Sequence, residues 1–435
     1  MKIPQSIQYI NTVLTFNNYS AYLVGGCVRD RLMGKEPKDY DMVTNAMPED
    51  IKDMFPGKVK EAGRIFGVSI INIGSENIEL ATMRKDGSYT DGRRPDHVIF
   101  TDNLKQDAAR RDFTMNCIYH NIATGTDIDP FHGIEDIKRK MIYTVGRPYD
   151  RFSEDKLRIL RAVRFAAQLD FSLHAEVFST ISKMKHNIKV LPMERVRDEF
   201  MKSITVRGIN LLFCTGLLEE IIPELLTLIG CTQPVMHHPE GDVFEHSLIV
   251  LKVLDKLTKN PLVKLAGLLH DIGKPVTRTE IGRKIQFIGH DRVGADIAKS
   301  ICQRLKLSSQ ETDLIYNLVK DHMMAHDGRK FAKSTLARFL RKDYINELIL
   351  LQHADALGCC NEEKSLRTFY LQKMESFATI VKSAPIIKGS DLIDLGLKPG
   401  PLFKEILTKC RETQDEGKIA CRASGLKYLK ELVGS

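Results

Sequence analysis

The spacing of apolar residues changes near residue 150 of this 435-residue chain. Before that point they form short runs, AYLVGG, VSIINIG, IELATM and HVIF, which Gly, Pro, Asp and Asn residues separate. Short apolar runs between turn formers are typical of β-strands. After it, in segments such as LRILRAVRFAAQL, apolar residues recur at every third and fourth position, as they do in amphipathic helices. The pattern predicts an α/β head followed by an all-helical remainder.

A chain of this length is expected to form several domains, because single hydrophobic cores rarely grow beyond about 250–300 residues. Turn-rich stretches such as GRPYD (146–150) and CTQPVMHHPEGD (231–242) mark the predicted joints. The predicted parts are a head (1–145), a helical neck and body (146–235), a second helical domain (236–365) and a helical tail (366–435).

Composition narrows the class of protein. Hydrophobic residues make up 43% and charged residues 28%, which fits a folded, soluble chain. The net charge of +8 permits a polyanionic partner without requiring one. The nine cysteines are scattered and form no CxxC pair, so we expect reduced thiols and a cytoplasmic location. We expect no membrane span and no signal peptide, because no run of about 18 apolar residues occurs and the N-terminus has no cleavage site.

Two features of the head point to phosphate chemistry. Gly25 and Gly26 follow a predicted strand and open a helix carrying Arg29, so backbone N–H groups can approach a phosphate closely. Asp39 and Asp41 are two residues apart, and in a strand both carboxylates would project from one face. Such a pair repels unless cations lie between them, as in a two-Mg²⁺ phosphoryl-transfer site. Alone, the glycines also fit a simple tight turn, and the aspartates a solvated strand end.

The helical half contains a second candidate site. His246 lies on one predicted helix, and His270 with Asp271 ends another. A third helix contributes Asp355. Nitrogen and oxygen donors on separate helices suit a transition metal or Mg²⁺. Each histidine taken singly also fits a core or surface position, but the ordered set favours a metal site.

Five blocks in chain order resemble the family of class II tRNA nucleotidyltransferases and bacterial poly(A) polymerases. They are GGCVRDRLMGKEPKDYDMVT (25–44), ARRDFTMNCIYH (109–120), IDPFHGIEDI (128–137), SEDKLRILRAVRFAAQLDF (153–171), and MERVRDEFMKSI (193–204) with GLLEEIIPEL (216–225). The resemblance implies a polymerase-β-like α/β nucleotidyltransferase head followed by an all-α neck, body and tail. LAGLLHDIGKP (265–275) resembles the HD phosphohydrolase superfamily, which makes residues 236–365 an HD domain.

The resemblance also implies roles for residues of the head. Asp39 and Asp41 would bind Mg²⁺ and carry the catalysis. Glu79 is either a third carboxylate of that site or an exposed strand residue. The residues implied to hold the triphosphate, ribose and phosphates of the nucleotide are Gly25, Gly26, Arg29, Arg111, Asp112 and Asn116.

The block around residue 155 carries the predicted base selection. On one continuous helix Glu154, Asp155 and Arg158 share a face, so spacing alone favours a surface salt bridge. The resemblance implies instead that Asp155 and Arg158 form a protein template for the base. The carboxylate would accept from the exocyclic amine of cytosine or adenine, and the guanidinium would donate to the neighbouring ring acceptor. Arg161 and Arg164 follow at helical spacing and would meet phosphate or line the helix.

Two further implications concern a loop and the HD domain. For residues 81–98 the resemblance implies a flexible loop that accompanies addition of the terminal A, whereas composition alone fits an exposed hairpin. The HD resemblance implies hydrolysis of phosphoesters on RNA or nucleotides and a divalent metal: Mg, Mn, Ni or Fe. The implied ligands are His246, His270, Asp271 and Asp355, with His290 and His322 as extra ligands or phosphate contacts.

The leading hypothesis is therefore a template-independent enzyme that adds CCA, or the terminal A, to tRNA from CTP and ATP, with an accessory phosphohydrolase. A poly(A) polymerase is the alternative within the same chemistry. Two alternatives come from other classes: an HD phosphohydrolase with a non-catalytic, RNA-binding head, and a purely structural RNA-binding protein. Either would leave the DYD (39–41) and RRD (110–112) blocks without a function. The nucleotides added, the HD metal, the role of the tail and the oligomeric state stay open at this stage.

Overall fold

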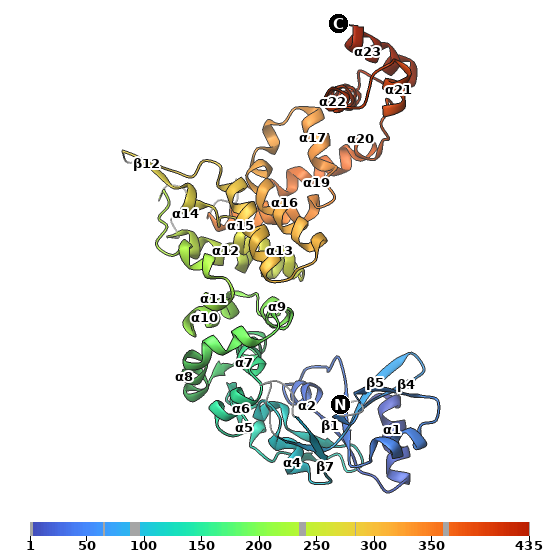
Figure 1. Ribbon diagram of the computed structural model, residues 1–435, viewed down its shortest axis with the longest axis vertical. Helices are drawn as coiled ribbons and strands as arrows, with labels where there is room; N and C mark the ends of the chain where they lie inside the picture. Colours follow the sequence, from blue (N-terminus) through green and yellow to red (C-terminus); the bar gives the residue numbers. More distant parts are fainter. Residues whose placement is uncertain are drawn as a thin grey trace. The chain divides into compact units, whose positions relative to one another are not determined.

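The computed structural model describes residues 3–63, 66–87, 96–234, 241–282, 284–359 and 365–434. The chain divides into two compact units, Met1–Ile221 and Ile222–Ser435. The first contains the mixed sheet and the helices up to α11, and the second contains the helices from α12 onward (Figure 1). Among the described residues, no helix combines the length and apolar character that crossing a membrane requires.

A seven-stranded mixed sheet forms the core of the head, with the order β3-β4-β5-β2-β1-β8-β9. Its strands are β1 (Ala21–Val24), β2 (Asp41–Thr44), β3 (Val59–Gly63), β4 (Val68–Ile73), β5 (Glu76–Thr82), β8 (Tyr119–Asn121) and β9 (Asp127–Ile128). Strand β2 pairs antiparallel with β1 and parallel with β5. Leu23, Met42 and Leu80 of these strands are almost fully buried and contribute to the apolar interior. This register places the end of β1, the start of β2 and the middle of β5 side by side.

Helices cover the sheet and continue into the neck. They are α1 (Gln5–Phe16), α2 (Gly26–Leu32), α3 (Pro48–Met54), α4 (Leu104–Ala109), α5 (Gly133–Lys138), α6 (Pro148–Glu154), α7 (Leu157–Leu169), α8 (Ala175–Met184), α9 (Met193–Met201), α10 (Val206–Cys214) and α11 (Leu217–Ile221). Helix α7 matches its predicted segment and packs against α9 and α10. Its buried face includes Ile159, Val163 and Ala166, which recur at helical spacing.

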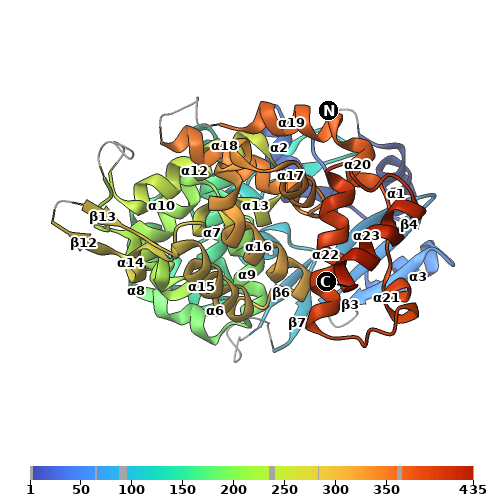
Figure 2. The ribbon, with the colours of Figure 1, turned by 90° about the horizontal axis from the view of Figure 1, so that it is seen from above.

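The second unit is built around α12 (Val243–Leu257), α13 (Pro261–Leu269), α15 (His290–Arg304), α16 (Ser309–His326) and α18 (Ile345–Gly358). Figure 1 shows α12, α13, α15 and α16 gathered in one bundle. Among the described residues, the prediction of a purely helical remainder is wrong at two places. In the neck, β11 (Ser172–Leu173) pairs with β10 (Met141–Ile142). Strands β12 (Thr279–Ile281) and β13 (Lys284–Gln286) form a hairpin that follows the short helix α14 (Lys274–Thr277), as Figure 2 shows. The β-branched residues Thr279 and Ile281 before a turn favour this strand pair over a helix.

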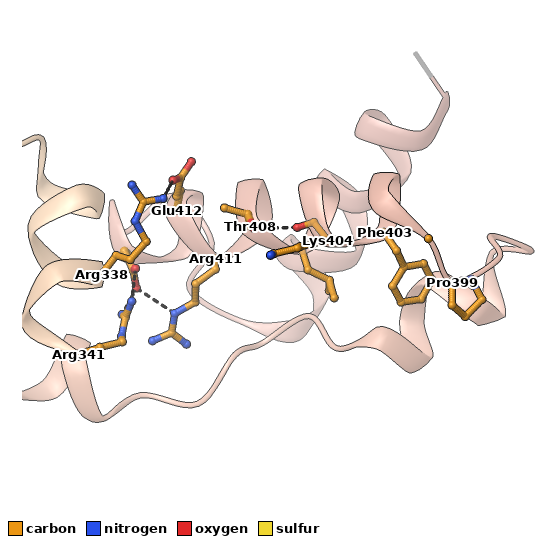
Figure 3. Close-up of a pocket in the computed structure, with 11 residues that line it drawn as sticks. Arg338, Arg341, Pro399, Phe403, Lys404, Thr408, Arg411 and Glu412 are labelled. Atoms are coloured by element: carbon orange, nitrogen blue, oxygen red, sulfur yellow. Dashed lines mark hydrogen bonds and ion pairs between the residues drawn. The ribbon is translucent and has the colours of Figure 1, made fainter. Parts of the chain in front are cut away.

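The tail consists of α19 (Arg367–Ser376), α20 (Ala378–Lys382), α21 (Gly389–Asp394), α22 (Pro401–Asp415) and α23 (Arg422–Gly434). Helix α22 packs against α17 (Lys333–Leu340), and a cavity of about 510 Å³ lies beside them. Figure 3 shows arginines at one end of this cavity and Phe403 with Pro399 at the other. Arg338 donates to Glu412 at 2.8 Å, and Arg341 donates to Asp415 at 2.7 Å. These ion pairs join the tail to the preceding helices.

Candidate functional site

The first group of candidate residues lies where β1 and β2 meet. Gly25 has φ +81°, a left-handed conformation that glycine adopts without strain and that turns β1 directly into α2. Asp41 begins β2, but Asp39 lies in the bend before it, so the prediction that both project from one strand is wrong. The reason is the register: Val24 is the partner of Asp41, so a residue at 39 would have to pair with Gly26, which is already helical.

Three carboxylates nevertheless influence one another here. Asp41 is the register partner of Glu79 on β5. Lost hydration raises the pKa of Asp41, and Asp39 raises it further, against the opposing effect of Arg111. Lost hydration, then Asp41, raises the pKa of Glu79. Mutual repulsion of this kind is relieved by a divalent cation, which fits oxygen ligands of this type.

A chain of hydrogen bonds leads from α2 to α7. Arg29 is buried and donates to Asn116 Oδ1 at 2.9 Å, and Asn116 donates to Asp112 Oδ1 at 3.2 Å. Asp112 Oδ2 accepts two bonds from Arg161, at 2.9 and 2.5 Å. Although burial acts to raise it, Arg161 lowers the pKa of Asp112 to about 2. Four predicted nucleotide-binding residues therefore form one charged network, with Asp112 ionised at neutral pH.

Arg111 is organised by a residue that the sequence did not single out. Asp107 on α4 is fully buried and accepts from Arg111 at 3.1 Å and from Tyr119 at 2.7 Å. It also accepts from Arg110 at 2.8 Å. Although burial acts to raise it, the two arginines hold the pKa of Asp107 well below its usual range. The signal was available in the sequence, because Asp107 precedes these arginines by three and four positions on the α4 turn.

The predicted base-reading residues line a pocket of about 290 Å³, called here the arginine pocket. It is lined by Arg84, Asp86, Arg110, Arg111, Asp112, Asp155, Leu157, Arg158, Arg161 and Arg195. Its lining side chains come from both the sheet-bearing head and the neck helices. Six arginines and three aspartates give it a positive balance, which suits a polyanionic ligand such as a nucleoside triphosphate.

Asp155 and Arg158 do not share one continuous helix, as the sequence interpretation assumed. Helix α6 ends at Glu154 and α7 begins at Leu157, because Asp155 takes an extended conformation and its Oδ1 accepts from the Leu157 N–H at 2.9 Å. Arg158 donates to Glu154 at 2.8 Å, as the salt-bridge alternative expected, and to the carbonyl of Arg110 at 2.8 Å. Both side chains still line the arginine pocket.

Arg164 lies apart from that pocket lining. It donates to Glu199 of α9 at 2.5 Å, and its guanidinium lies 3.9 Å from the centre of the Phe165 ring.

The loop predicted over residues 81–98 falls partly on residues 88–95, which lie outside the described part of the chain. On either side, β6 (Arg84–Asp86) pairs with β7 (Val98–Phe100).

The second group of candidates forms the histidine–aspartate cluster of the helical unit. It contains two sets of three buried side chains, each set close enough to hold one metal ion: His246, His270 and Asp355, and Asp271, His290 and His322. Asp271 faces both sets, because its Oδ2 is 3.2 Å from His270 Nε2 and its Oδ1 is 3.3 Å from His290 Nε2. All four predicted ligands and both suggested extras are thus brought together.

The hydrogen-bond chemistry of this cluster fits a cation. The Nδ1 atoms of His270, His290 and His322 lie 2.6–2.8 Å from backbone carbonyls, which only accept. Nδ1 therefore carries the proton of each neutral ring, and its buried Nε2 presents a lone pair, which cannot accept from the carboxylates beside it. Burial lowers the pKa of His322 to about 3, so its Nε2 lone pair faces the Asp271 carboxylate. A divalent ion between the His322 nitrogen and the Asp271 carboxylate would bind the lone pairs of both.

Without a metal, protons and a lysine balance the charge of the cluster. Although burial acts to lower it, Asp271 and Asp355 raise the pKa of His270 to about 10. Lys274 donates to Asp271 Oδ2 at 2.6 Å. Metal binding would displace the His270 proton. A pocket of about 530 Å³ opens onto the cluster, with Lys274, Phe287 and Met323 among its lining residues.

Three family profiles match the chain. Residues 21–143 match a "Poly A polymerase head domain", residues 170–228 a "Probable RNA and SrmB-binding site of polymerase A", and residues 243–358 an "HD domain". Among curated proteins, the CCA-adding enzyme of Oceanobacillus iheyensis is 43% identical over 193 residues, 44% of this chain and 48% of the relative. Poly(A) polymerase I of Haemophilus influenzae is 36% identical over 271 residues, 57% of this chain and 58% of the relative. The matched region spans about half the length of these curated relatives.

Solved structures match the whole chain. The CCA-adding enzyme of Bacillus stearothermophilus, in complex with CTP, has a TM-score of 0.76 and 25% identity, and covers 100% of this chain and 98% of that one. The Thermotoga maritima CCA-adding enzyme, complexed with tRNA, has a TM-score of 0.60 and 20% identity, and the match covers 99% of this chain and 95% of that one. At this identity the similarity concerns the fold alone. The predicted fold class is thereby confirmed.

Proposed function

We propose that this chain, which belongs to the family of class II tRNA nucleotidyltransferases and bacterial poly(A) polymerases and carries an HD domain, adds nucleotides to the 3′ end of tRNA. ATP and CTP would be the substrates, and CCA or its terminal A the product. The observation that carries the proposal is that one unit contains both the three carboxylates around the start of β2 and the arginine pocket.

The residues of the head would divide the work as follows. Asp39 and Asp41, with Glu79 beside them, would hold Mg²⁺, which supplies charge neutralisation for the attacking 3′-hydroxyl and the leaving pyrophosphate. Backbone N–H groups at Gly25 and Gly26 would contact the triphosphate. Arg29 is buried and bonded to Asn116, so it would act by orienting that amide toward the sugar.

Base selection would take place in the arginine pocket. The Leu157 N–H occupies Asp155 Oδ1, which leaves Oδ2 to accept from an exocyclic amine. Arg158 is held by Glu154 and two backbone carbonyls and would donate to the ring acceptor beside that amine. Cytosine and adenine share this pattern, whereas uracil and guanine present an acceptor where the carboxylate needs a donor.

Incorporation of labelled CMP and AMP into tRNA transcripts without CCA tests this activity. The proposal expects incorporation by the parent chain and its loss in Asp39→Ala. Absence of incorporation by the parent chain would refute it.

A poly(A) polymerase is the alternative function, and the name of the Haemophilus influenzae relative favours it. It predicts long A tails on unrelated RNA.

The histidine–aspartate cluster supports an accessory phosphohydrolase activity. Its residues would hold divalent metal, which supplies Lewis acidity toward a phosphoester oxygen. Lys274 would attract the phosphate, and the apolar walls around Phe287 would accept a nucleoside or RNA end. Hydrolysis of nucleoside 2′,3′-cyclic phosphates by the parent chain, lost in His270→Asn, is the expected result. Unchanged hydrolysis in that variant would assign the activity elsewhere.

A further inference from the structure

His326 differs from the other histidines near the cluster. It lies one helical turn after His322 on α16, and its Nε2 is 2.8 Å from Asp355 Oδ2. The other oxygen of that carboxylate, Oδ1, is 3.0 Å from His246 Nε2. Oδ1 also lies 3.7 Å from His270 Nε2, so it is the oxygen that faces the ligand set, whereas Oδ2 faces His326.

The partners of Gln352 determine the tautomer of His326. Gln352 is fully buried on α18, and its Oε1 accepts the Leu366 N–H at 2.9 Å. Because a backbone N–H only donates, this bond fixes the orientation of the amide. The amide nitrogen then faces His326 Nδ1 at 3.3 Å and donates to it. The proton of a neutral His326 ring therefore lies on Nε2, pointing at Asp355.

His270, His290 and His322 have the opposite arrangement. Their Nδ1 atoms donate to backbone carbonyls, so each Nε2 offers a lone pair to a metal. The Nε2 of His326 has no lone pair to offer while Gln352 occupies Nδ1. His326 thus faces the cluster as a hydrogen-bond donor, whereas these three rings, in the neutral form that binds metal, face it as acceptors.

We propose that His326, oriented by Gln352, is a positioning residue for the metal centre of the histidine–aspartate cluster. By donating to Asp355 Oδ2 it holds the carboxylate with Oδ1 toward the ion and restrains it from rotating. The inference rests on the metal centre assigned above under the proposed function. Hydrogen bonds that orient a ligand in this way typically change metal affinity by about 10–100-fold.

The test is Co²⁺ binding by the full chain after chelation, followed by calorimetry and by the visible absorption of bound Co²⁺. His326→Leu is expected to weaken Co²⁺ binding about 10–100-fold and to alter the absorption spectrum. His326→Gln, which keeps an N–H donor near the Nε2 position, should restore most of the affinity. His353→Leu is the matched control, because His353 lies on α18 and bonds Ser365 instead.

Because His326→Leu removes two hydrogen bonds to α18, the thermal midpoint of the metal-free chain should fall, and Co²⁺ affinities are compared at a temperature where both chains are folded, which separates positioning from folding. If the leucine variant does not fold, His326→Phe keeps the ring volume without the donor and should show the same loss. Parent-like affinity and spectrum in a folded variant without the donor would overturn the positioning role while leaving the metal centre intact. Absence of Co²⁺ binding by the parent would refute the metal centre, and the inference with it.

Discussion

The substitution Asp155→Asn probes the proposed base selection most sharply. Asp155 Oδ1 accepts the Leu157 N–H and so holds the break between α6 and α7. Asparagine keeps an oxygen for that bond and replaces Oδ2 with an NH₂ group. The neck should therefore retain its fold, while the pocket changes from accepting to donating at the position of the exocyclic amine.

The size of the effect follows from one hydrogen bond to a charged group. Such a bond contributes about 1.5–3 kcal/mol, which corresponds to about 10–150-fold in kcat/KM. We expect kcat/KM for CTP to fall by that factor. UTP, which presents an acceptor at the same position, should lose less or gain, so the preference for CTP over UTP should narrow.

The assay is single-nucleotide extension of a tRNA transcript that lacks CCA, with CTP and UTP measured separately. Asp150→Asn is the matched control, because it makes the same change at an exposed position of α6. A preference for CTP that stays at the parent value in Asp155→Asn, with the protein folded, would refute the assignment of Asp155 as the base-reading carboxylate.

Three further outcomes are expected. Asp41→Asn should lower the rate of nucleotide incorporation about 10²–10³-fold or more, because a bound metal stabilises the transition state by several kcal/mol. Asp53→Asn on α3 is the control and should leave the rate unchanged. Equal rates in the two variants would contradict the carboxylate site. Because the pKa of Asp112 is lowered in the folded chain, its ionised carboxylate adds to the free energy of unfolding. This contribution is fully present above the unfolded pKa near 3.9 and is lost as pH falls through about 2. Asp112→Asn should therefore cost about 2 kcal/mol in urea unfolding at pH 7 and progressively less toward pH 2, and a constant difference would exclude this linkage. Chelation should lower the thermal midpoint, and Mn²⁺ or Ni²⁺ should restore it, because a metal at 100 times its Kd adds about 2.7 kcal/mol to the free energy of unfolding. His270→Asn should abolish this response, and its persistence in that variant would locate the metal elsewhere.

Hydrophobic spacing predicted the elements whose character depends on their own residues. Helix α7 begins and ends where its apolar period does, and β1, β4, β5 and β7 correspond to the four apolar runs. Spacing did not predict the place of Asp39, because that depends on where its partner strand β1 ends. The break at Asp155 had a local signal that the continuous helical pattern hid: aspartate favours the cap position before a helix.

The same distinction applies to the candidate sites. Ordered motifs indicated the six residues of the histidine–aspartate cluster, because each belongs to a recognisable pattern. Asp107 and His326 were missed, since each acts through another side chain rather than through a motif of its own. Helical spacing relates Asp107 to its arginines and His326 to His322, but only the fold shows that His326 meets Asp355 from a different helix.

The most direct test of the central claim is extension of tRNA transcripts that end before CCA, after C and after CC, with each nucleoside triphosphate singly and mixed, in Mg²⁺. The proposed function predicts completion of each transcript to CCA, or of the CC-ended transcript by a single A, followed by a stop. Long A tails on any RNA would favour the poly(A) polymerase, and no incorporation at all would contradict the nucleotidyltransferase assignment.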